Sequence, residues 1–186
     1  MEIQHINVKI FVADNATVDL EKVNLVFHEW IQNDAGDGEL LVDVADYAHV
    51  PAGPGMMLIG HESNFSLDFT VDNRAGLLYN RKTRLVGENT DRLSDALKRA
   101  LSACDRLEAH AHFKGALKFN RQDMLLVVND RALVPNEQDT YQRLKPDFDA
   151  VLGEIFADSH KLEFLEGDPR ERFTVRVSAS REPVVV

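Results

Sequence analysis

Histidines and carboxylates that could do acid–base chemistry gather in one short stretch, DYAHVPAGPGMMLIGHE. The stretch begins at Asp46, ends at Glu62, and contains His49 and His61. A histidine beside a carboxylate can act as a general base, because the carboxylate orients the imidazole ring and stabilises its protonated form. These four residues are therefore the candidate catalytic residues of the sequence.

The strands expected around this stretch place the candidate residues at opposite ends of a hairpin. Apolar patterns indicate strands at 39–47 and 55–62, joined by a loop that contains PAGPG. If these strands pair as a hairpin, Asp46 and His49 lie near the loop, and His61 lies about 20 Å away at the other end. A single site would need a different pairing, or a loop that folds back. Because His61 ends an apolar row, we expect its ring to be half-buried and hydrogen-bonded to a neighbouring strand.

A candidate ligand-binding pair, Tyr79 and Arg81, lies in the segment GLLYNRK. Residues two apart point to the same face of a strand, so the hydroxyl and the guanidinium could together bind an anion or a carboxylate. The same pattern also fits a solvated strand face on which the tyrosine packs against an aromatic residue of the next strand. The sequence leaves both interpretations open.

Evidence for a metal site or a cofactor site is weak in the sequence. His110 and His112, in HAH, could chelate a metal ion if their segment is extended. The neighbouring Cys104 is expected on the inner side of a helix, where a thiol acts as a small apolar side chain. No HExxH spacing is present, and the PAGPG loop leads into a strand rather than into a phosphate-binding helix. We therefore predict no metal and no cofactor, and a solvated helix exit at the two histidines.

The order of apolar patterns predicts an α+β fold, with a mostly antiparallel sheet and about three helices packed on it. Helices are expected at 19–34, 89–111 and 136–158. The predicted order is β-α-β-β-β-β-α-β-β-α-β-β, in which ALKFN and DMLLVVND form a hairpin around RQ. Short connections between successive strands favour antiparallel pairing. We expect one domain over 1–186, and we leave open whether it consists of two related halves that meet near residue 88.

The charge of the chain argues against two classes of partner. The sequence has 31 acidic and 21 basic residues, and its formal net charge is −10. An acidic surface repels nucleic-acid phosphates and anionic lipids, so we expect neither nucleic acid nor a membrane as a partner. A single cysteine permits no disulfide within the chain, and the N-terminus lacks the pattern of a signal peptide. We expect a soluble, cytoplasmic protein.

The run DVADYAHVPAGPGMMLIGHE, followed by GLLYNRK, resembles a family of uncharacterised bacterial proteins. The resemblance also includes NDRALVPN and DPRERFTV, and so spans most of the chain. It implies a bacterial cytoplasmic protein, but it brings no activity, cofactor or site residue.

Two hypotheses about function follow from the sequence. The first is a small protein that binds a small ligand or is an oligomeric non-catalytic protein, and we expect a homo-oligomer because self-association is the commonest way to cover sheet edges. The alternative is an enzyme that acts on a small polar metabolite by histidine–carboxylate acid–base chemistry. Its site would use Asp46, His49, His61, Glu62, Tyr79 and Arg81. The two hypotheses differ in whether these side chains converge on one pocket.

Overall fold

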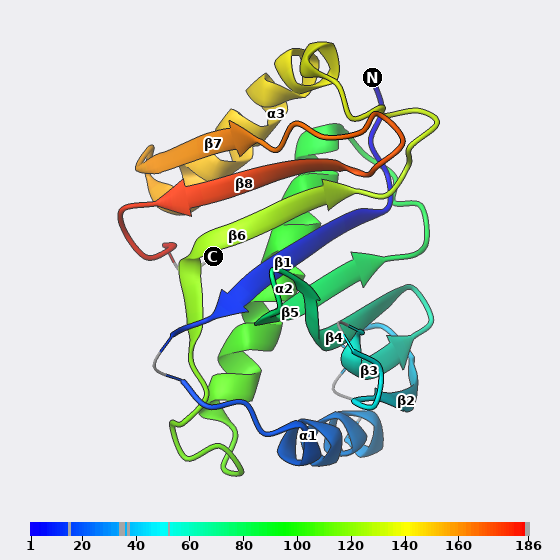
Figure 1. Ribbon diagram of the computed structural model, residues 1–186, viewed down its shortest axis with the longest axis vertical. Coiled ribbons are helices and arrows are strands. Elements are labelled where there is room, and N and C mark those ends of the chain that lie inside the picture. The colour runs from blue at the N-terminus through cyan, green and yellow to red at the C-terminus, as the bar shows by residue number, and fades with distance from the viewer. Residues whose placement is uncertain (15, 34–35, 37, 52, 185–186) are drawn as a thin grey trace.

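The computed structural model describes residues 1–14, 16–33, 36, 38–51 and 53–184. Within these ranges the chain forms three helices and eight strands (Figure 1). The helices are α1 (Leu20–Gln32), α2 (Asn89–Ala109) and α3 (Gln138–Phe156). The strands are β1 (Ile6–Val12), β2 (Leu41–Tyr47), β3 (Gly55–Gly60), β4 (Ser63–Val71), β5 (Arg74–Arg81), β6 (Phe119–Val128), β7 (His160–Phe164) and β8 (Phe173–Ala179). The expected α+β fold is confirmed.

All the strands belong to one antiparallel sheet, in the order β2-β3-β4-β5-β1-β6-β8-β7. Figure 1 shows α2 and α3 behind this sheet and α1 at the end formed by β2 and β3. The three helices and the sheet share one apolar core, to which α1 contributes Phe27 and Trp30. The central strand β1 is buried along its whole length. The order of elements agrees with the expectation except between α2 and α3.

The hairpin expected between α2 and α3 is wrong, because one ten-residue strand, β6, occupies this part of the chain. The two residues that suggested a turn, Arg121 and Gln122, lie inside the strand, and the charged side chains of this run have partners on other elements. Arg121 forms an ion pair with Glu108 of α2, and Asp123 forms one with Arg176 of β8. A buried or half-buried strand can therefore hold this polar run without turning.

The inner face of α2 carries the apolar stripe that its periodicity predicts, with Leu93, Leu97 and Cys104 buried. Burial raises the pKa of the Cys104 thiol well above its ordinary value. Leu101, which was expected on this stripe, is only partly buried. The buried positions advance by three and four residues through Ala100, so Leu101 falls on the edge of the stripe.

The two outer strands of the sheet carry charged side chains. On β2, Asp43 accepts a hydrogen bond from the backbone N–H of Val44 at 2.8 Å. On β7, Lys161 and Glu163 are exposed. Charged residues on edge strands discourage pairing with another chain. Homo-oligomerisation therefore stays a prediction, and these two edges give it no support.

Candidate functional site

The candidate catalytic residues do not form a single site. Strands β2 and β3 pair as the expected hairpin, with Asp46 opposite Met56 near the loop and Leu41 opposite Gly60 at the far end. Asp46 and His49 are exposed beside the loop. His61 follows Gly60, so it lies at the opposite end of the hairpin, as the strand spacing predicts.

The expected burial of His61 is wrong. Its side chain is exposed, and its ring has no hydrogen bond to any part of the chain that the structure describes. Only its backbone N–H is engaged, with the carbonyl oxygen of Leu40 at 2.8 Å. The physical reason is that β3 ends at Gly60, so His61 lies in the turn to β4 and does not continue the apolar row. A general base positioned by a partner is therefore not found at this residue.

Three of the other candidates do come together, beneath α2. The Nη2 atom of Arg81 lies 2.9 Å from the Oε2 atom of Glu62. Tyr79 is fully buried and packs on Phe65 of the neighbouring strand, with 5.2 Å between ring centroids. The aromatic cross-strand partner is confirmed, whereas the solvated face is wrong, since Tyr79 and Arg81 are both buried.

Further charged residues, which the sequence did not connect with Arg81, neutralise this cluster. Asp95 of α2 lies 3.9 Å from Arg81 and 3.1 Å from Arg99. Arg99 also faces the buried carboxylate of Glu39 at 3.9 Å. Together with Glu62, three carboxylates face two guanidinium groups, so no positive charge remains for an anionic ligand. We interpret the cluster as a structural network that fastens α2 to the sheet.

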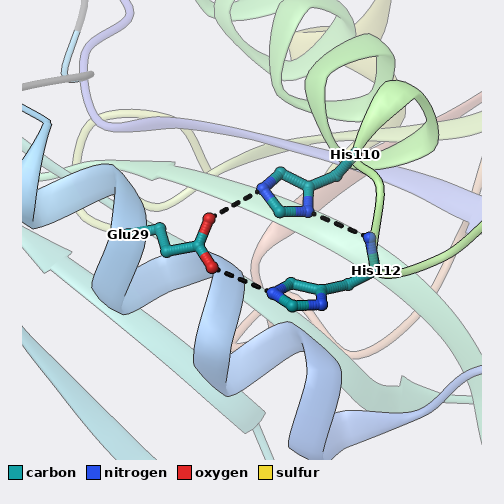
Figure 2. A group of neighbouring side chains, drawn as sticks. All are labelled: Glu29, His110 and His112. Carbon is teal, nitrogen blue, oxygen red and sulfur yellow. Dashed lines mark hydrogen bonds and ion pairs between the residues drawn. The ribbon is translucent and has the colours of Figure 1, made fainter.

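A different group of side chains has the composition of a metal site (Figure 2). Glu29 of α1 faces two histidines that follow α2, His110 and His112, and directs one carboxylate oxygen at each ring. The Oε2 atom of Glu29 lies 3.1 Å from Nε2 of His110, and its Oε1 atom lies 2.9 Å from Nε2 of His112. One donor atom from each of the three residues lies within 4.8 Å of the others.

Local structure explains how the three side chains meet. Helix α2 ends at Ala109, and His110 has extended backbone angles, which turn the chain away from the helix axis. The two imidazole rings then stack, with 5.1 Å between centroids. The residue after Glu29, Trp30 of α1, stacks on the guanidinium of Arg106 of α2, with 3.8 Å between Cζ of Arg106 and the centre of the Trp30 ring. This contact holds α1 against the end of α2, where its neighbour Glu29 reaches the histidines.

Glu29 and the two histidines are only partly covered. The exposed fractions of the side chains are 41% for Glu29, 21% for His110 and 40% for His112. Solvent and small ions can therefore reach them. The hydrogen bond with His112 holds the pKa of the Glu29 carboxyl below its usual value. Glu29 is consequently a carboxylate at neutral pH and available as a ligand.

The hydrogen bonds also assign the ring proton of His110. The backbone N–H of His112 donates to Nδ1 of His110 at 3.4 Å, so this nitrogen is an acceptor. In the neutral ring the proton then lies on Nε2, the nitrogen that faces Glu29 (Figure 2). A metal ion bound at Nε2 would move this proton to Nδ1 and break the long contact with the N–H of His112.

The expected solvated helix exit is only partly correct, because both histidines bind Glu29 from another helix. Cys104, the nearby residue that was expected on the inner side of the helix rather than as a ligand, is indeed buried in the core. Glu29 precedes His110 by 81 residues, and no pattern in the sequence connects the two. The third ligand reaches this position because α1 packs on β2 and β3 and contacts the end of α2 through Trp30.

No protein-family model matches this chain, and no curated protein matches its sequence significantly. In addition, no helix in the described ranges is long and apolar enough to cross a membrane. The geometry of the chain itself is therefore the basis for inferring its function.

Proposed function

We propose that this protein binds a divalent transition-metal ion through Glu29, His110 and His112. The observation that carries the proposal is the convergence of three donor atoms, one from each residue, within 4.8 Å. This proposal makes the small-ligand hypothesis specific. The ligand is the metal ion, together with the water or small anion in its remaining coordination positions.

The observed spacings are close to those between ligands in a metal site. Bonds of about 2.0–2.1 Å give ligand–ligand edges of about 3.3 Å around a tetrahedral ion and about 3.0 Å around an octahedral one. The two carboxylate–imidazole spacings are 3.1 Å and 2.9 Å. These two spacings involve different oxygens of Glu29, and one donor atom from each residue lies within 4.8 Å of the others, so an ion would draw the three side chains together.

The donor atoms favour one class of ion. Two imidazole nitrogens and one carboxylate oxygen suit zinc, iron, cobalt, nickel or copper, whereas calcium and magnesium prefer sites built from oxygen. Three protein ligands leave at least one coordination position for water or for a small exchangeable anion. The partial exposure of Glu29, His110 and His112 provides access to that position.

A zinc titration followed by calorimetry tests the proposal. We expect the wild-type chain to bind one ion, and His112→Gln and Glu29→Gln each to weaken binding by more than about tenfold, because each removes a ligand. Affinity should also fall as the pH is lowered, since protonated imidazoles cannot bind metal. The matched control is His28→Gln, which changes an exposed histidine beside Glu29 on α1. Equal zinc affinity in all four proteins would contradict the proposal, and so would calcium binding as tight as that of zinc.

A further inference from the structure

A cleft with several arginines lies at another end of the molecule, away from α1. Strand β6 ends beside the start of β8, where Val128 pairs with Phe173. The loop after β6 and the loop between β7 and β8 therefore meet at the same end of the sheet (Figure 1). They border an open, solvent-exposed cleft of about 530 Å³, lined by Asn129, Arg131, Arg170, Glu171, Arg172 and Thr174. Every lining residue is polar or charged.

Contacts between the two loops position the arginines. The Nη1 atom of Arg131 donates a hydrogen bond to the carbonyl oxygen of Arg170 at 3.2 Å, which connects the loops across 39 residues of sequence. Arg170 itself is held by the Asp168 carboxylate, which accepts hydrogen bonds from the Arg170 guanidinium at 2.6–3.2 Å and from its backbone N–H at 2.9 Å. The Asp168 carboxylate neutralises Arg170 and fixes the turn from which Arg172 extends.

Two guanidinium groups of the cleft have no acidic partner in the described ranges of the chain. Neither Arg131 nor Arg172 forms an ion pair there, although acidic residues outnumber basic ones by 31 to 21 overall. Glu171 also lines the cleft without an ion pair. The cleft thus contains two uncompensated positive charges and one uncompensated negative charge. Its positive character contrasts with the net charge of −10 of the whole chain.

We propose that this cleft binds a small phosphate dianion, either inorganic phosphate or the phosphate group of a small monoester. The planar fork of a guanidinium matches two oxygens of a phosphate, and two forks from different loops can hold one dianion between them. Thr174 and Asn129 supply neutral polar groups beside the arginines. Glu171 opposes binding by like-charge repulsion. This proposal goes beyond metal binding and does not depend on it, because the residues involved are different.

A titration of the full chain with inorganic phosphate, followed by the backbone amide NMR signals, tests the proposal. We expect signals of residues 129–131 and 168–174 to shift and saturate. Arg131→Gln and Arg172→Gln should each weaken binding about tenfold, because each removes one guanidinium and its charge-assisted hydrogen bonds to the phosphate. Arg181→Gln is the matched control, because Arg181 is exposed, has no ion pair in the described chain and lies beyond the opposite end of β8. Equal loss in the control and cleft variants would overturn the proposal.

Substitution of Glu171 separates a specific site from general charge attraction. We expect Glu171→Gln to strengthen phosphate binding, whereas Glu154→Gln, which makes the same charge change at an exposed position of α3, should have little effect.

Two further titrations identify the source of the ligand. Tighter binding of a monoester such as glycerol phosphate assigns the site to organic phosphates, and tighter binding of inorganic phosphate assigns it to the free ion. Acetate binding as tight as phosphate, or no saturable shift with either phosphate, would overturn the proposal.

Discussion

Substitution of Lys9 by methionine should lower the free energy of unfolding by about 3–5 kcal/mol, because it leaves a buried carboxylate without its counter-ion. Lys9 of β1 and Asp68 of β4 form an ion pair in which the side chains are 2% and 0% exposed. Gly76 leaves space for the lysine, since a Cβ atom there would lie 2.8 Å from Cε of Lys9. Burial lowers the pKa of Lys9, and the attraction of Asp68 only partly opposes this effect.

The double variant Lys9→Met with Asp68→Leu is the control for that prediction. Removal of both charges also removes the desolvation cost, so its stability should lie close to that of the wild type. Urea unfolding followed by the fluorescence of Trp30, the single tryptophan, measures both variants. Equal losses in the single and double variants would show that packing, and not the pairing of the two charges, explains the effect.

Saturating zinc should raise the melting temperature of the wild-type chain by about 5–10 °C. Ligand at a hundred times its dissociation constant stabilises a folded protein by about 2.7 kcal/mol, and each kcal/mol corresponds to about 2–4 °C in a chain of this size. The ion would connect α1 to the end of α2, so the gain should require both elements. Thermal melts with and without zinc measure the shift.

Glu29→Gln and His110→Gln should reduce the zinc-dependent shift to about half or less, because each removes one of the three ligands and weakens binding by about tenfold or more. His28→Gln should keep it, because His28 is exposed and lies outside the site. Magnesium at the same concentration should give no shift, since the two nitrogen donors do not suit this ion. An equal zinc shift in the Glu29 variant would contradict binding at this position.

Local patterns in the sequence predicted most of the fold. Apolar periodicity placed all three helices, and the pairing of β2 with β3 correctly separated Asp46 from His61. The missed feature was β6, in which a polar run looks like a turn. Its polar side chains find partners on α2 and β8, and these partners are distant in the sequence. A local pattern contains no information about such partners, so the error has a physical cause.

The candidate site was less accessible to sequence analysis than the fold. His110 and His112 were recognised as possible ligands, but the third ligand depends on how α1 packs. Helix α1 packs on β2 and β3 and contacts α2 through Trp30 and Arg106, and no local pattern in the sequence predicts these contacts. Similarly, Tyr79 and Arg81 were predicted to share a face, but the burial of that face depends on α2 above it. Spacing along one strand or helix is readable in a sequence, whereas contacts between elements are not.

X-ray absorption spectroscopy of the zinc-loaded protein tests metal binding by Glu29, His110 and His112 most directly, because it reports the atoms around the ion. We predict two imidazole nitrogens at about 2.0–2.1 Å, with oxygen atoms completing the coordination sphere. In the His110→Gln and His112→Gln variants the number of imidazoles should fall. A spectrum without imidazole, or one with the same imidazole count in the wild type and both variants, would contradict the proposed site.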